Sequence, residues 1–207
     1  MIGVVDYGAG NLASVTNALD FLEVPWQHAS STPQLLAADA VVFPGVGAAG
    51  PAMAGLRASG LDQGLLEFLR SGRPYLGICL GLQLLFQRSS EDDSPCLGFL
   101  GGEVERLATS QKVPHVGWNT VAVVRPSPLL TGLDGAYFYF THSYVVRPTS
   151  QDVVEAETDH GGTFVSAIGC ERVFGVQFHP ERSGRDGLRL LNQFCLLAPV
   201  TSDSHAG

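Results

Sequence analysis

The sequence predicts an α/β fold: a mostly parallel, open sheet flanked by helices, with additional antiparallel strands in the second half of the chain. In the first half, short apolar runs alternate with segments of helical periodicity, a pattern typical of parallel sheets covered on both faces. In the second half, β-rich segments follow one another across glycine and proline turns, which favours antiparallel pairing. Apolar residues make up 45% of the 207 residues and charged residues 15%, a composition typical of a globular protein.

The first half contains three apolar runs of strand length and three segments of helical character. Apolar residues recur at helical spacing from Leu12 to Leu22, with polar residues on the opposite face. The last apolar run leads directly into a second apolar segment, which is expected to be a mostly buried helix. The expected strands are 1–6, 39–43 and 74–78, and the expected helices are 12–22, 61–71 and 80–87.

The second half contains β-rich segments and one final helix, with Leu188, Leu191, Cys195 and Ala198 on a single stripe. We expect one domain over residues 1–198. The small, polar residues at the end are expected to form a disordered tail over 199–207. The β-rich segments are 119–125, 136–147, 153–157, 163–168 and 172–178, and the helix is 185–197.

Charge and hydropathy exclude several functional classes. The net charge is −8 and no cluster of Lys and Arg is present, so nucleic-acid binding is not expected. No stretch reaches the roughly 18 apolar residues of a membrane span, and the start of the chain has the pattern of a strand rather than a signal peptide. The four cysteines show no C-x-x-C spacing, which argues against a metal site or a disulfide framework. A cytoplasmic protein without metal is the expectation.

Cys79 lies where a predicted strand meets a predicted helix, within the G-x-C-x-G pattern of residues 77–81. This is the cysteine counterpart of the nucleophile elbow G-x-S-x-G, in which flanking glycines allow strand and helix to approach closely. A helix that begins at the cysteine favours the reactive thiolate, and its free N–H groups can hold an oxyanion. A buried cysteine between two packing glycines would give the same pattern.

His179 and Glu181 provide a base and a group to orient it. The segment 173–178 is a predicted strand that Pro180 ends, so His179 emerges at the carboxyl edge of the sheet, where sites of α/β proteins assemble. Glu181 is near enough in sequence to accept a hydrogen bond from the imidazole. A surface histidine in a turn is the alternative, and the combination with the cysteine motif favours the catalytic interpretation.

Two glycine-rich turns follow other strands. Residues 44–47 (P-G-V-G) could turn the N–H of the Val46–Gly47 peptide toward an oxyanion, although an ordinary turn would have the same letters. Residues 8–10 (G-A-G) could belong to a dinucleotide-binding turn. That alternative is weaker because Ala13 stands at the third glycine position and no acidic residue ends a clear second strand.

Taken in order, P-G-x-G, G-x-C-x-G and H-P-E resemble the motifs of the class I, triad-type glutamine amidotransferases, whose fold is flavodoxin-like. Four segments are similar to one branch of that family, the glutaminase subunits of imidazole glycerol phosphate synthase. The resemblance covers residues 2–197, with one departure: Arg182 stands where the family often has Lys. The four segments are 6–12 (D-Y-G-A-G-N-L), 114–119 (P-H-V-G-W-N), 139–144 (Y-F-T-H-S-Y) and 175–181 (G-V-Q-F-H-P-E).

The resemblance implies that Cys79 attacks glutamine, His179 transfers protons and Glu181 orients His179. It implies no cofactor. Ammonia would pass to a separate cyclase subunit with a (β/α)8-barrel fold, which converts PRFAR to imidazole glycerol phosphate and AICAR in histidine biosynthesis. The chain has no room for a barrel of about 250 residues. The oxyanion and substrate would be held by Val46, Gly47, Leu80, Gln83, His142, Ser143 and Tyr144, and the partner interface would include Pro114, Trp118, Asn119, Tyr139 and Arg182.

Three other functions share part of this pattern. A triad glutaminase could serve pyridoxal phosphate synthase or anthranilate synthase instead, and segments 6–12 and 114–119 argue against both. A cysteine hydrolase that acts alone would need no partner. A binding module that has lost catalysis would not need the intact triad.

Overall fold

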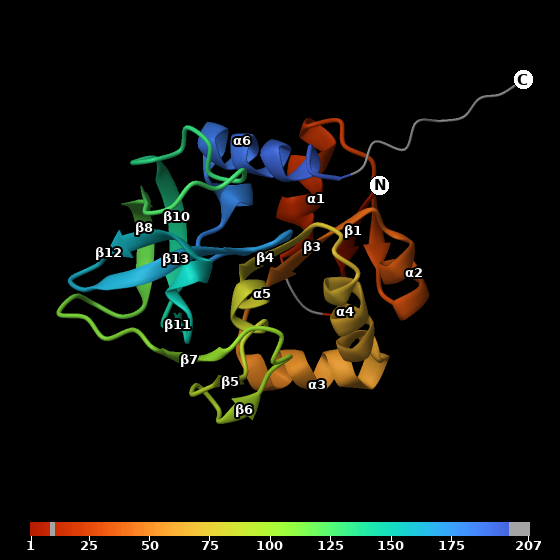
Figure 1. Cartoon of the computed structure of the whole chain (residues 1–207), viewed down its shortest axis with the longest axis horizontal. Coiled ribbons are helices and arrows are strands. Elements are labelled where there is room, and N and C mark those ends of the chain that lie inside the picture. Colours follow the sequence, from red (N-terminus) through yellow and green to blue (C-terminus); the bar gives the residue numbers. More distant parts are fainter. Residues whose placement is uncertain (9–10, 199–207) are drawn as a thin grey trace, which may run out of the picture.

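The computed structural model describes residues 1–8 and 11–198, so the predicted tail lies outside the described residues. A central sheet of eight strands has the order β2-β1-β3-β4-β14-β13-β12-β9 (Figure 1). The five strands from β2 to β14 are parallel, and the last three are antiparallel to their neighbours. The strands are β1 (Ile2–Val5), β2 (Trp26–Ala29), β3 (Ala40–Gly45), β4 (Tyr75–Cys79), β9 (Ala122–Val123), β12 (Val154–Asp159), β13 (Thr163–Cys170) and β14 (Val173–Val176).

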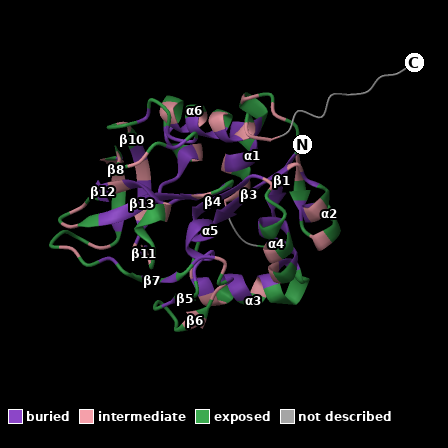
Figure 2. Ribbon diagram, in the orientation of Figure 1, coloured by how far each residue is buried: buried purple, intermediate pink, exposed green. Residues whose placement is uncertain are grey.

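Helices cover both faces of this sheet, as Figure 1 shows. On one face, α1 (Leu12–Phe21) and α6 (Gly184–Cys195) pack through Leu19 and Phe194 onto alternate residues of the central strands. On the other face lie α2 (Thr32–Ala37), α3 (Ala49–Ser59) and α4 (Leu61–Arg70). The central strands are almost entirely buried, whereas the outer sides of the helices are exposed (Figure 2). The predicted α/β class is therefore confirmed.

Two smaller sheets stand beside the central one. Strand β10 (Tyr137–His142) pairs antiparallel with β8 (His115–Thr120). A four-stranded sheet has the order β11-β7-β5-β6, formed by β11 (Tyr144–Pro148), β7 (Gly102–Arg106), β5 (Arg88–Ser89) and β6 (Ser94–Pro95). The segment 136–147 was expected to be β-rich, and Ser143 divides it between the two sheets. Two short 3-10 turns are also present, η1 (Gln151–Val153) and η2 (Pro180–Arg182).

The predicted helix over 80–87 is wrong beyond its first turn. Helix α5 covers only Leu80–Gln83. Beyond Leu84, the N–H groups of Leu85 and Phe86 donate to carbonyls three residues back, and the N–H of Gln87 donates to the Gly102 carbonyl at 3.1 Å instead of to Gln83. The carbonyls of Leu84, Leu85 and Phe86 accept from the N–H groups of Leu97, Leu100 and Gly98, respectively, at 2.8–3.0 Å. These carbonyls are therefore committed to a tertiary contact, which local periodicity does not reveal. The elements β2, α2 and α3 were also not anticipated.

Two further properties concern residues 1–8 and 11–198 only. No helix in these ranges is both long and apolar enough to span a membrane. No group of three or more His, Cys, Asp or Glu side chains within them is arranged to hold a metal ion.

Candidate active site

Three neighbouring parallel strands bring the three sequence motifs together at one edge of the sheet. The P-G-V-G turn begins in β3, Cys79 ends β4, and His179 follows β14. In the strand register Gly45 lies opposite Cys79, and Val176 lies opposite Ile78. Because all three strands run in the same direction, their carboxyl ends meet. Residues separated by about a hundred positions are thereby placed around one pocket.

Cys79 occupies a strained elbow between β4 and α5. Its backbone has φ 54° and ψ −106°, a conformation that residues other than glycine rarely adopt. A Cβ atom on Gly77 would lie 2.4 Å from the carbonyl oxygen of Gly81, and one on Gly81 would lie 2.1 Å from that of Phe43. Both positions require glycine, as the G-x-C-x-G pattern predicts. The buried Tyr75 hydroxyl donates to the Gly81 carbonyl at 3.0 Å and holds the turn closed.

The sulfur of Cys79 receives a hydrogen bond that the sequence did not predict. Gln177 is fully buried, and its Nε2 donates to Sγ of Cys79 at 3.5 Å. Helix α5 has only one turn, so its dipole is small compared with that of a long helix. The polar contact to the sulfur that was expected from the helix therefore comes from the side-chain amide of Gln177.

His179 and Glu181 form a buried pair. Nδ1 of His179 donates to Oε1 of Glu181 at 2.8 Å, and the two side chains are 4% and 1% exposed. Burial lowers the pKa of His179, but the Cys79 side chain and the Glu181 carboxylate outweigh burial and raise this pKa above its usual value. Among the described residues, Nε2 of His179 and Oε2 of Glu181 have no hydrogen-bond partner. Nε2 is thus the nitrogen left to exchange protons.

A cavity of about 420 Å³ opens over Cys79. Val46 and Gly47 lie at its rim, and Gly47 has φ +87°, a conformation in which the preceding peptide can turn without a side-chain clash. Every predicted oxyanion or substrate residue lies in the lining, and Glu181 stands behind His179. The lining comprises Val46, Gly47, Ala48, Cys79, Leu80, Gln83, Glu91, Pro114, Thr141, His142, Ser143, Tyr144 and His179.

Four residues at this site were not predicted as site residues, namely Ala48, Glu91, Thr141 and Gln177, and two of them need comment. Among the described residues, Glu91 alone contributes a carboxylate to the lining, which suits the α-ammonium group of an amino acid. It belongs to a polar loop whose sequence shows no pattern. Gln177 is different, because a fully buried amide within the apolar run 173–178 is unusual. The presence of this polar residue in an apolar run was the signal in the sequence that could have identified Gln177 as a site residue.

The residues predicted for a partner interface take two orientations. Trp118 and Tyr139 lie on the outer face of the β8–β10 sheet, with ring centroids 6.3 Å apart, and the guanidinium of Arg182 covers the Tyr139 ring at 4.5 Å. Pro114 is exposed and also reaches the cavity. Asn119 points to the inner face, where its amide donates to the Asp159 carbonyl at 2.8 Å.

An α/β sheet with a cysteine at an elbow, a buried His–Glu pair and a glycine turn at the same edge defines a cysteine-dependent acyl-transfer enzyme. The chain belongs to the class-I glutamine amidotransferase family, whose model matches residues 4–198.

Relatives of high similarity cover nearly the whole chain. A Dehalococcoides mccartyi protein named imidazole glycerol phosphate synthase subunit HisH is 44% identical over 96% of this chain and 98% of its own length. A Methanothermobacter thermautotrophicus protein of the same name is 47% identical over 94% of this chain and 97% of its own. A crystal structure of a glutamine amidotransferase has a TM-score of 0.76 at 24% identity, covering 95% of this chain and 98% of that one. At this identity the last comparison establishes the fold.

Proposed function

We propose that this chain is the glutaminase subunit of imidazole glycerol phosphate synthase. It hydrolyses glutamine to glutamate and ammonia and passes the ammonia to a cyclase subunit, which converts PRFAR to imidazole glycerol phosphate and AICAR in histidine biosynthesis. The observation that carries the proposal is the buried Cys79–His179–Glu181 constellation beneath a cavity of about 420 Å³. Relatives that carry this subunit's name match this chain over nearly their full length, which supports the choice of pathway.

In the first half-reaction, the thiolate of Cys79 attacks the side-chain carboxamide carbon of glutamine. A carbon–sulfur bond forms, and negative charge develops on the carboxamide oxygen. The backbone N–H of Leu80 and a turned Val46–Gly47 peptide hold this oxyanion. Nε2 of protonated His179 gives its proton to the nitrogen as the carbon–nitrogen bond breaks, so that ammonia leaves and a thioester remains.

In the second half-reaction, water replaces ammonia. Neutral His179 takes a proton from water through Nε2, and the hydroxide attacks the thioester carbon. The carbon–sulfur bond breaks, the carboxylic acid product loses its proton to solvent and leaves as glutamate, and the thiolate and imidazolium are restored. Glu181 accepts from Nδ1–H throughout, at 2.8 Å in this structure, which keeps Nε2 directed at the sulfur and stabilises the imidazolium.

The cavity lining can hold both ends of the substrate. Glu91 suits the α-ammonium group, because it is the carboxylate that residues 1–8 and 11–198 place in the lining. The segment from His142 to Tyr144 also lines the cavity and offers backbone groups, and Gln83 lines it beside them, with its amide donating to the Tyr144 carbonyl. Glutamine would therefore lie with its carboxamide over Cys79.

The partner would be a separate cyclase chain with a (β/α)8-barrel fold, forming a heterodimer in the cytoplasm. Its docking site would include the outer face of the β8–β10 sheet, where Trp118 is 56% exposed beside Tyr139 and Arg182. Exposed aromatic residues and arginine are enriched at such contacts. A closed passage at this contact would prevent the loss of ammonia to bulk water, where protonation removes its nucleophilicity.

The test uses the chain together with a purified cyclase subunit. The variant Cys79→Ala should abolish synthesis of imidazole glycerol phosphate from glutamine while synthesis from added ammonium salt continues. If synthesis from ammonium is also lost in a complex that still assembles, the proposed division of labour is wrong. If the unsubstituted chain supports no synthesis from glutamine with this partner, the proposed pathway is wrong.

A further inference from the structure

A chain of hydrogen bonds crosses the protein from the β8–β10 sheet to the nucleophile. It begins at Asn119, whose Nδ2 lies 3.3 Å from Nε2 of His115. Nδ1 of His115 lies 3.0 Å from Nε2 of His142, and Nδ1 of His142 lies 3.0 Å from the carbonyl oxygen of Tyr144. Three side chains on the inner face of two paired strands are thus connected to a residue that lines the cavity.

The same carbonyl connects to the sulfur by a second set of bonds. Nε2 of Gln83 donates to the Tyr144 carbonyl and to Oε1 of Gln177, each at 3.1 Å. Nε2 of Gln177 then donates to Sγ of Cys79 at 3.5 Å. The Tyr144 carbonyl therefore receives two hydrogen bonds, and the Gln83 amide uses both of its N–H groups.

The direction of every bond on the histidine side follows from chemistry. A carbonyl only accepts, so Nδ1 of His142 carries a proton and Nε2 of neutral His142 must accept. Nδ1–H of His115 therefore donates, and Nε2 of His115 accepts from the Asn119 amide. The arrangement requires both rings to be neutral and in the same tautomer, with the proton on Nδ1.

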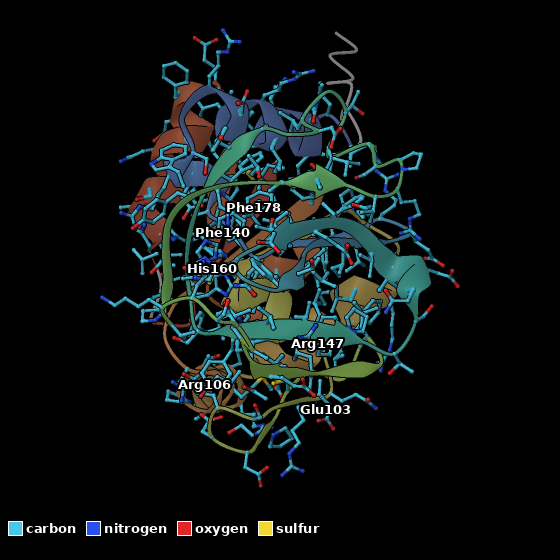
Figure 3. The ribbon with its side chains drawn as sticks, turned by 90° about the vertical axis from the view of Figure 1, so that its left-hand side faces the viewer. Glu103, Arg106, Phe140, Arg147, His160 and Phe178 are labelled. Atoms are coloured by element: carbon cyan, nitrogen blue, oxygen red, sulfur yellow. The ribbon has the colours of Figure 1, made fainter. Side chains whose placement is uncertain are left out.

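The environment keeps the rings in this state. Burial lowers the pKa of His115 to about 4, and burial lowers that of His142 to about 3. The His115 ring is stacked between His160, at a centroid distance of 4.0 Å, and Phe140, at 4.8 Å. Phe140 and His160 occupy neighbouring positions on the side of the molecule that Figure 3 presents. His115 can therefore neither turn nor charge readily.

Such a cluster is not needed for stability alone. Buried polar groups contribute to stability only when all of them are satisfied, and apolar side chains would fill the same space at no desolvation cost. Here two imidazoles, which are 3% and 6% exposed, are fully satisfied and lead to the cavity. This series of hydrogen bonds is suited to fixing the positions of the atoms that it connects.

We infer that His115 is a positioning residue for glutamine hydrolysis, acting with Asn119 through His142 to fix the Tyr144 carbonyl and, through Gln83 and Gln177, the sulfur of Cys79. The inference rests on the proposed function and assigns it a residue outside the cavity lining. Without the His115 donor, the His142 ring loses the bond that sets its tautomer. The Tyr144 carbonyl, Gln83 and the amide on the sulfur then lose their fixed positions in turn.

The experiment compares two substitutions of His115 in the complex with the cyclase. In His115→Asn, the side-chain amide can occupy the place of Nδ1–H and still donate to His142. His115→Phe keeps the stacked ring but has no donor. The matched control is Phe164→Leu, because Phe164 packs against both histidines, with centroid distances of 5.8 and 5.0 Å, but makes no hydrogen bond in the chain.

Two readouts are needed: kcat and KM for glutamine hydrolysis, and the rate of Cys79 alkylation by iodoacetamide without glutamine. His115→Phe should lower kcat roughly 5- to 100-fold, the range for loss of a buried hydrogen-bond partner, and should change the alkylation rate. His115→Asn should restore both to within about threefold of the unsubstituted protein, since the donor to His142 is retained. Phe164→Leu should lower the melting temperature but leave the alkylation rate unchanged.

The outcomes separate the two proposals. The inference is overturned if His115→Phe and Phe164→Leu lose activity and alkylation rate in equal measure, or if His115→Asn restores nothing. If the unsubstituted complex does not hydrolyse glutamine, the proposed function fails. The alkylation rates still decide the role of His115 in that case, because they require neither glutamine nor turnover.

Discussion

The substitution Glu181→Gln tests the orienting role of the carboxylate with almost no change in shape. At present Oε1 of Glu181 accepts from Nδ1 of His179 at 2.8 Å, while Oε2 is buried without a partner among the described residues. An amide must place its NH₂ group at one of these two positions. At the Oε2 position, the NH₂ group is a buried donor without an acceptor. At the Oε1 position, it donates to Nδ1 and forces the wrong imidazole tautomer.

The cost can be estimated from these two terms. Replacing a hydrogen bond to a charged group by a neutral one loses about 1 kcal/mol, and leaving a buried donor unsatisfied costs about 1–3 kcal/mol. Together they amount to about 2–4 kcal/mol, which corresponds to a decrease of roughly 30- to 1,000-fold in kcat/KM. KM should change little, because the Glu181 side chain lies behind His179 and outside the cavity lining.

The assay is steady-state release of glutamate by the complex with the cyclase. Synthesis from added ammonium salt serves as the control for folding and assembly. A variant within about threefold of the unsubstituted enzyme would show that the charge on Glu181 is not needed, since such a change is below the cost of a single lost hydrogen bond. A parallel loss with ammonium would show instead that the substitution disrupts the complex.

Further predictions concern the base, the elbow, the outer face and pH. His179→Ala should reduce glutamine hydrolysis more than Glu181→Gln does, because the base itself is removed; equal losses would contradict the assigned roles. Gly81→Ala should lower the free energy of unfolding by about 3 kcal/mol or more in a denaturant titration, since its Cβ would lie 2.1 Å from the Phe43 carbonyl oxygen. Trp118→Ala should weaken cyclase binding, measured by calorimetry, by about 2 kcal/mol if this exposed ring is an interface anchor; unchanged affinity would remove Trp118 from the interface. The folded-state pKa of His179 is raised, so protonation of His179 stabilises the fold. The unsubstituted protein should therefore have a larger free energy of unfolding than Glu181→Gln below about pH 6.5, and this difference should disappear as pH rises through the folded-state pKa of His179. A difference that grows with pH would contradict this sign.

The triad and the central sheet could be predicted because local patterns determine them. The elbow at Cys79 needs glycines two residues away on either side, and each glycine avoids a backbone clash in the structure. His179 comes shortly after the buried strand β14, which ends at Val176, so its place at the sheet edge follows from the parallel register. In each case a few adjacent letters specify the geometry.

The remaining features depend on contacts between distant segments. Helix α5 ends after one turn because the groups that would extend it bond to distant residues: the N–H of Gln87 donates to Gly102, and the carbonyls of Leu84 to Phe86 accept from Leu97, Gly98 and Leu100. The division of segment 136–147 at Ser143 arises because its two halves pair with β8 and β7, respectively. The tautomers of His115 and His142 follow only from the Tyr144 carbonyl and the Asn119 amide together. In each case the residues that form the contact are distant in sequence, and the local sequence of the segment does not identify them.

The turn that contains His179 and η2 is also hydrogen-bonded to strand β10 of the β8–β10 sheet. The amide of His179 donates to the Tyr139 carbonyl at 2.8 Å, the Ser183 hydroxyl accepts from the Tyr139 amide at 3.0 Å, and Arg182 covers the ring of the same tyrosine. The general base, the orienting carboxylate and the surface cation thus all lie within four consecutive positions of the main chain, 179–182. The backbone that carries the imidazole is therefore bonded directly to Tyr139, so a displacement of that residue would move His179 as well.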